Sequence, residues 1–203
     1  ALKQRFFERV YDLAYDACQV LRVLKQFEAN QDSSVELNPH RKWVYLATTT
    51  SDVQDERDRI KRELLERGHG VLPDGPLPML SSDVELTVGE CLEKCSIAIH
   101  LLGRHYGVTP EDSSESIPAL QLRLTAQRLG VQRLVWMPGG EGIADERQKA
   151  FIVRVQEDPL LHDRAEIIEG NLNLLKKDLI RRLEPPVEKP KPPTPAKASS
   201  GAP

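Results

Sequence analysis

Alternation of short apolar runs with amphipathic stretches over residues 42–137 constrains the fold of this chain more than any other feature. The runs have the length and composition of buried strands, and the segments between them repeat apolar residues at the spacing of helices. Such alternation is typical of a parallel sheet covered by helices. We therefore expect a flavodoxin-like three-layer α/β fold with a five-stranded parallel sheet. The expected strands are 42–47, 69–73, 96–103, 133–137 and 165–168.

Ligands of such sheets bind outside the carboxyl ends of the strands. A site is therefore expected at the turns that begin at Thr48, Pro73, Gly103 and Pro138. The glycine cluster at 139–142 has neither the spacing nor the Lys-Ser/Thr ending of a phosphate-binding loop, so we interpret it as a turn. A kinase or a Rossmann dehydrogenase is not expected.

The chain divides into three parts. Residues 39–184 hold the α/β pattern and form the expected domain. Residues 1–38 are an N-terminal helical segment and connector, whose amphipathic helix must pack on the α/β core, on a second copy or on a neighbouring domain. Residues 185–203 are rich in Pro, Lys and Ala, which indicates a linker or tail of extended polyproline character.

Charge and composition exclude several classes of function. A net charge of −3 and a pI near 6.0 give no basic field, so direct nucleic-acid binding is not expected. No apolar stretch approaches the roughly 20 residues that span a bilayer, so no membrane contact is expected. Three cysteines do not make a disulfide framework, which favours a cytoplasmic protein. Cys91 and Cys95 lack a second pair of ligands, so they are expected to be core thiols, with no metal.

Four segments carry a resemblance to a known family. Residues 43–57 read WVYLATTTSDVQDER, a strand followed by hydroxyl residues and then Gln-acid-Glu-Arg, and residues 95–107 end in Gly-Arg-His-Tyr-Gly. A long loop spans 74–83, and a helix is expected from Ser116. Over residues 42–184 the chain resembles the Toll/interleukin-receptor (TIR) domain, and more closely its bacterial TIR-like relatives of uncharacterised function.

The resemblance implies a function. Enzymatic TIR domains cleave the bond between nicotinamide and ribose in NAD, so it implies NAD as substrate and NAD+ glycohydrolase chemistry in a bacterial innate-immunity, antiviral-defence or cell-death pathway. It also implies self-association through TIR-like domains and a flanking or partner sensor domain. The residues expected to contact NAD are Thr48, Thr49, Ser51, Arg57, Leu77, Tyr106 and Ser116.

The catalytic glutamate of such enzymes falls on Gln121 in this chain. Glutamine keeps the size of glutamate but cannot carry its charge. Loss of one charge that stabilises the oxocarbenium-like transition state would reduce the rate by about two to three orders of magnitude. Three explanations are open: a substitution made to trap substrate, a natural loss of catalysis, or a register in which Glu115 is the acid.

Several of these residues also have a purely structural interpretation. The hydroxyls of residues 48–51 could simply satisfy backbone groups of a turn, and Asp52 is expected to cap the following helix rather than act as a catalytic acid. Arg57 is either a member of a surface ion pair or a phosphate contact. His100 is expected within a buried strand, whereas His105 lies in a loop from which it could reach a ligand.

Two further functions remain open. The same fold could act as a non-catalytic signalling and assembly module through the 74–83 loop, which the amide at Gln121 favours. A nucleoside deoxyribosyltransferase-like enzyme shares the architecture, and it too would need an acid at Gln121.

Overall fold

The computed structural model describes residues 41–139 and 142–184, with five isolated positions near the amino terminus. The rest of the expected N-terminal segment 1–38, residues 39–40 and the expected tail 185–203 lie outside the described residues. The five isolated positions are helical and exposed, and they are Val10, Leu13, Ala14, Ala17 and Leu21.

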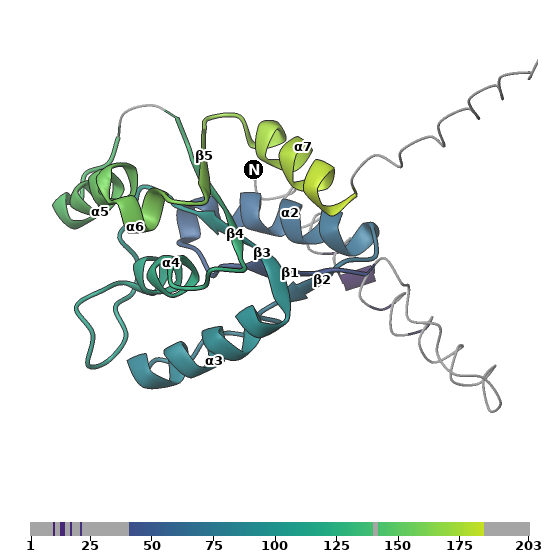
Figure 1. Ribbon diagram of the computed structural model, residues 1–203, viewed down its shortest axis with the longest axis horizontal. Coiled ribbons are helices and arrows are strands. Elements are labelled where there is room, and N and C mark those ends of the chain that lie inside the picture. Colours follow the sequence, from purple (N-terminus) through teal and green to yellow (C-terminus); the bar gives the residue numbers. More distant parts are fainter. Residues whose placement is uncertain are drawn as a thin grey trace, which may run out of the picture.

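A five-stranded sheet forms the centre of the domain (Figure 1). Every pairing is parallel and the strand order is β2-β1-β3-β4-β5, which confirms the expected flavodoxin-like α/β fold. The strands are β1 (Trp43–Leu46), β2 (Gly70–Leu72), β3 (Cys95–Leu101), β4 (Gln132–Met137) and β5 (Ala165–Glu169).

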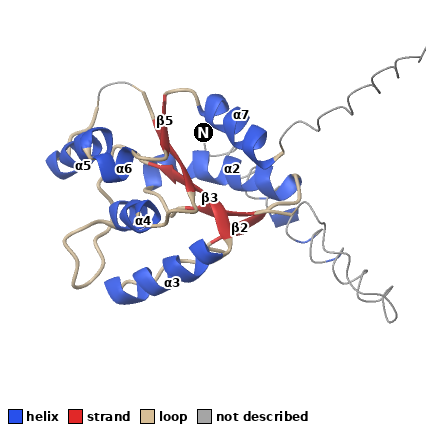
Figure 2. Ribbon diagram, in the orientation of Figure 1, coloured by secondary structure: helices blue, strands red, loops and turns tan. Residues whose placement is uncertain are grey.

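Helices cover both faces of this sheet (Figure 2). Helices α2 (Gln54–Glu66) and α7 (Leu172–Leu183) pack on one face; α3 (Ser81–Glu93), α4 (Ile117–Ala126) and α5 (Glu146–Glu157) pack on the other. Two short elements complete the described part: the 3-10 helix η1 (Ser51–Val53) precedes α2, and α6 (Pro159–His162) precedes β5. Neither short element was expected from the sequence.

Alternate residues of each central strand enter different cores. Val44 and Leu46 of β1 belong to the core under α2 and α7, whereas Tyr45 and Ala47 belong to the core under α3 and α4. All four are buried because both faces of a doubly covered sheet are inside the protein. That double burial is why the strand runs in the sequence are nearly continuous in apolar residues.

The register brings the carboxyl ends of the strands together at one edge. Leu46 pairs with Ile99, and Leu101 pairs with Trp136. Because β1 lies between β2 and β3, the strand order reverses between β1 and β3, where ligands bind in folds of this class.

The structure corrects two boundaries. Helix α3 begins at Ser81 instead of residue 84, so the expected 74–83 loop ends at Leu80 and its last three residues form the first helical turn. Asp83 favours that early start because a carboxylate is stabilised at the positive end of a helix. Cys95 is the first residue of β3, so the strand expected at 96–103 begins one residue earlier, and Cys91 on α3 and Cys95 lie on different elements.

None of the helices described in residues 41–139 and 142–184 combines the length and apolar character needed to cross a bilayer.

Candidate functional site

The exit of β1 is held by the guanidinium of Arg57. Arg57 is on α2, and it donates from Nε to the carbonyl of Ala47 at 2.9 Å and from Nη2 to the carbonyl of Leu46 at 3.1 Å. Burial lowers the pKa of this group. The donors Nε and Nη2 aim at the strand end, so Arg57 clamps the backbone there; the phosphate contact stays a prediction.

In the hydroxyl-rich turn after β1, one side chain bonds to the backbone and another faces solvent. Thr49 Oγ1 donates to the carbonyl of Leu101 at 2.6 Å, which joins the exits of β1 and β3. Ser51 begins η1 and is exposed. Thr49 thus fits the structural interpretation of the turn, whereas Ser51 faces solvent.

Gln121 is enclosed at the junction of β1 and α4, with no exposed surface. Its Oε1 accepts hydrogen bonds from the hydroxyl of Tyr45 at 2.7 Å and from the backbone N–H of Thr48 at 2.9 Å. Its Nε2 donates to the carbonyls of Thr48, at 2.9 Å, and Ile117, at 3.2 Å. Both ends of the amide are therefore in use, and burial raises the pKa of Tyr45 well above its ordinary value.

Asp52 joins β1 to the exit of β3. Its Oδ2 accepts from the backbone N–H of Arg104 at 2.6 Å, and its Oδ1 lies 3.5 Å from Nδ1 of His105. The expectation that Asp52 caps the helix is wrong, because the N-cap of α2 is Val53 and no side chain caps it. The carboxylate instead turns toward the neighbouring strand, where the backbone N–H of Arg104 offers a donor.

Tyr106 and Ser116 lie on the loop that leads to α4. The hydroxyl of Tyr106 donates to the carbonyl of Ser114 at 3.3 Å, and the guanidinium of Arg147 lies 4.9 Å from the ring centroid, covering one ring face. Ser116 takes the expected N-cap position of α4, but its hydroxyl makes no cap bond and is buried without a partner. Of these two hydroxyls, that of Ser116 is the one without a hydrogen-bond partner among the described residues.

Glu115 is a salt-bridged carboxylate. Its two oxygens accept from Nε of Arg123 at 2.8 Å and from Nη2 of Arg154 at 3.0 Å. Partial burial alone would raise its pKa, but the hydrogen bonds from the two arginines outweigh burial and lower that pKa below its ordinary value. Glu115 therefore stays ionised, with its charge shared between two cations.

The 74–80 loop is joined to the loop at 104–115. The N–H of Glu111 donates to the carbonyl of Met79 at 2.7 Å, and Leu80 forms an isolated parallel bridge with Glu111. Leu77 is half-buried against the core under α3. The expected NAD-contact residue Leu77 thus packs against this core, and the exposed apolar side chains of the loop are those of Met79 and Leu80.

Several of the expected segments do meet. A Cβ placed on Gly107 would lie 3.0 Å from Cγ2 of Thr50 and 3.3 Å from Cδ of Pro118. Gly107 also has φ of +88°, a conformation that favours glycine. The β1 turn, the exit loop of β3 and the start of α4 are therefore in contact.

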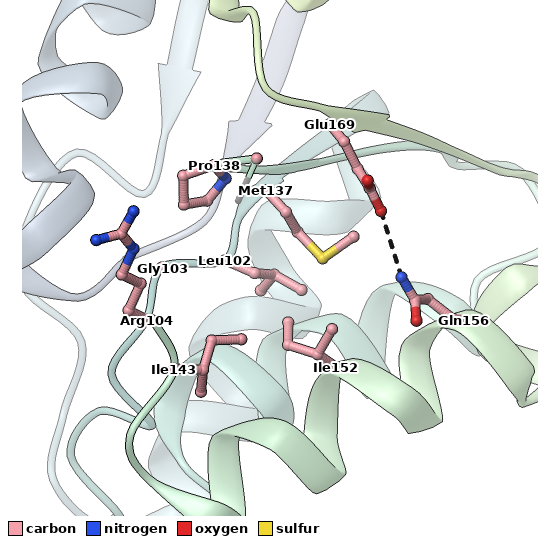
Figure 3. A pocket seen from close by; sticks show the side chains of 10 residues that line it. Leu102, Gly103, Arg104, Met137, Pro138, Ile143, Ile152, Gln156 and Glu169 are labelled. Carbon is pink, nitrogen blue, oxygen red and sulfur yellow. Dashed lines mark hydrogen bonds between the residues drawn. The ribbon is translucent and has the colours of Figure 1, made fainter. Parts of the chain in front are cut away.

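A cavity of about 190 Å³ lies elsewhere on the carboxyl edge, beyond β3, β4 and β5 (Figure 3). Two of the expected turns, at Gly103 and Pro138, contribute to its wall, but none of the residues expected to contact NAD does. Sequence reasoning missed its lining side chains because they come from distant parts of the chain. The lining residues are Leu102, Gly103, Arg104, Met137, Pro138, Gly139, Ile143, Ile152, Gln156 and Glu169.

Within the described ranges, no group of three or more His, Cys, Asp or Glu side chains is placed to hold a metal ion. Cys95 is buried and Cys91 half-buried, and burial raises the pKa of both thiols, that of Cys95 to about 12. These are the core thiols expected from the sequence. Comparisons with protein-family models, with curated proteins and with solved structures find no match to this chain.

Proposed function

We propose that this domain is a non-catalytic TIR-like signalling and assembly module, which recruits other TIR-like domains through the 74–80 loop and the loop joined to it. The observation that carries the proposal is the hydrogen bonding of Gln121. A flanking or partner sensor domain belongs to the same proposal. Two free thiols, Cys91 and Cys95, support a cytoplasmic setting for it.

Gln121 supports the assembly role because its amide is chemically required where it lies. Its Nε2 faces two carbonyl oxygens, those of Thr48 and Ile117. An ionised glutamate has no donor, so it would oppose both carbonyls inside a buried site. The amide is therefore suited to joining β1 to α4, and a carboxylate for NAD cleavage is not. This favours natural absence of catalysis over a substitution made to trap substrate.

The joined loops offer an apolar surface for assembly. Met79, Leu80 and Val108 are exposed, with 49%, 37% and 58% of their surface in solvent, and we call these three residues the loop surface. The backbone hydrogen bond between Glu111 and Met79 holds the two loops together. Exposed apolar residues mark an interaction site where they form one contiguous patch, which is what this proposal assigns to the loop surface. A second TIR-like domain is the partner that this proposal assigns to them.

Sedimentation velocity over a range of concentrations tests the assembly role. We expect the chain to self-associate, and Met79→Asp and Val108→Asp to remain monomeric because a charge is not tolerated in an apolar contact. Leu129→Asp is the matched control, since Leu129 is 78% exposed and lies on the loop before β4, at the opposite edge of the sheet. A monomeric wild type at every concentration, or association that the loop variants do not change, would contradict the proposal.

A second candidate is the NAD+ glycohydrolase. Ser116 favours it, because a buried hydroxyl without a partner at the start of α4 is where a ligand is expected to bind. Glu115, held ionised next to it in the chain, would be the acid in that case. Its carboxylate would stabilise an oxocarbenium-like centre as the nicotinamide leaves.

Release of nicotinamide from NAD separates the two candidates. The wild type, Glu115→Gln and Gln121→Glu are compared at high protein concentration. Release by the wild type that Glu115→Gln abolishes would establish the glycohydrolase with Glu115 as its acid. Release by Gln121→Glu alone would mark Gln121 as a disabled catalytic position. No release from any chain, with no rise in Tm on adding NAD, would remove the second candidate.

A further inference from the structure

The cavity beyond β3, β4 and β5 has a composition suited to a small ligand. Its wall is largely apolar, and the apolar side chains come from the ends of two strands, a loop and α5 (Figure 3). Leu102 and Met137 are almost fully buried, with 2% and 5% of their surface exposed. Ile143 and Ile152 contribute on the side of α5. An apolar body placed here would replace water against these side chains.

Polar groups lie at opposite sides of this wall. Figure 3 shows Arg104 on one side, and Gln156 with Glu169 on the other. Nε2 of Gln156 donates to Oε1 of Glu169 at 3.3 Å, a long bond that leaves acceptor capacity on both side chains. A ligand that fits both sides would carry an anionic group toward Arg104 and a hydrogen-bond donor toward Glu169.

The guanidinium of Arg104 is available for an anion. Among the described residues its side chain makes no hydrogen bond and no ion pair, unlike Arg147 and Arg154, which are paired with Asp145 and Glu115. It lies against Gly142, where an added Cβ would be 3.4 Å from Nη1. A planar guanidinium binds a carboxylate with two parallel hydrogen bonds.

We propose that this cavity binds a small organic acid with an apolar or aromatic body and a hydroxyl at the end opposite its carboxylate. The carboxylate pairs with Arg104, the body lies between Met137 and Ile152, and the hydroxyl donates to Glu169. At about 190 Å³ the cavity is below the roughly 300 Å³ at which pockets for drug-sized ligands begin, so it is too small for a dinucleotide. The site is thus separate from assembly and from NAD cleavage.

Isothermal titration calorimetry on the full chain with 4-hydroxyphenylacetate is the direct test. This probe has a carboxylate, a ring and a hydroxyl in the proposed order. Tyramine is the comparison, because an amine replaces the carboxylate. We expect saturable binding of the acid at or below about 1 mM and binding of tyramine at least about tenfold weaker, the factor expected when one charge-assisted hydrogen bond is lost. Equal affinities, or no saturable binding of the acid, would overturn the proposal.

Variants then place the ligand in the cavity. Ile152→Trp fills the apolar space and is expected to abolish binding, whereas Val153→Trp, at the exposed neighbouring position, leaves it unchanged. If Ile152→Trp does not fold, Ile152→Phe is used in its place. Arg104→Gln is expected to weaken binding of the acid about tenfold or more, and Arg128→Gln, at the opposite edge of the sheet, to have no effect. Unchanged binding in both the Ile152 and Arg104 variants would overturn the proposal.

Discussion

Gln121 and Thr48, which are 73 residues apart in the chain, form a two-way hydrogen-bonded pair. The backbone N–H of Thr48 donates to the side-chain amide, and the amide donates back to the carbonyl of Thr48. A side chain thereby extends the exit of β1 as a neighbouring strand would. Position 121 thus holds the turn at the exit of β1.

Replacing this amide should destabilise the fold. Gln121→Glu is expected to lower the free energy of unfolding by about 3 kcal/mol at neutral pH, because a buried carboxylate would face two carbonyl oxygens. Urea denaturation measures the change. Gln127→Glu, at the exposed end of the same helix, is the matched control and should stay within about 0.5 kcal/mol of the wild type. Equal stability of the Gln121 variant would mean that the site tolerates a carboxylate.

The contact between Gly103 and Asp52 should leave no room for a larger residue. A Cβ on Gly103 would lie 2.4 Å from Oδ2 of Asp52, so Gly103→Ala is expected to cost about 2 kcal/mol of stability. Thermal unfolding of Gly103→Ala, Asp52→Ala and the double variant checks this. The double variant should be more stable than the sum of the single effects implies, because removing the carboxylate removes the clash. Strict additivity would contradict this explanation.

His100 should make stability fall in weak acid. Its Nε2 lies 3.0 Å from Oγ1 of Thr125, which itself donates to the carbonyl of Leu122, so Nε2 carries the proton. Burial, with a smaller contribution from the nearby Arg133 charge, lowers the pKa of His100 to about 3. The unfolded chain therefore binds a proton near pH 6.5 that the folded chain does not, and stability is lost as the pH falls from there toward the folded pKa.

The measurement for His100 is the free energy of unfolding at pH 7 and at pH 5. Wild type should lose about 2 kcal/mol more over this interval than His100→Gln, which does not titrate. His162→Gln is the control, because His162 is exposed. Equal pH dependence in wild type and the His100 variant would show that the buried imidazole does not carry the effect.

Glu115 should contribute to stability down to a lower pH than His100. Its pKa is lowered in the folded state, so its contribution is present above the ordinary value of 4.5 and is lost as the pH falls through the lowered pKa. Glu115→Gln is expected to cost up to about 1 kcal/mol at neutral pH, since the salt bridges are partly exposed and screened. Denaturation at neutral and at acidic pH measures the free energy of unfolding of Glu115→Gln. Glu111→Gln, in the same loop, is the control variant. A difference that persists at acidic pH would mean that packing, not charge, holds Glu115.

Local patterns in the sequence were enough for the arrangement of strands and helices. The apolar runs predicted all five strands, and the segments between them predicted helices that cover the sheet. These predictions hold because the pattern of burial along a strand or helix depends on residues that are close together in the sequence. The early start of α3 was missed, since hydroxyl and acidic residues suit a loop as well as a first helical turn.

The candidate sites depended on tertiary structure. The turns at Gly103 and Pro138 were predicted to lie at the ligand-binding edge, but Ile152 and Glu169 complete the cavity from elements that follow much later. The sequence alone determined that this chain folds into a covered parallel sheet. Only the tertiary structure decided that Arg57 and Gln121 clamp the backbone, because the groups they satisfy become neighbours only when separate elements pack, and no local periodicity records that pairing.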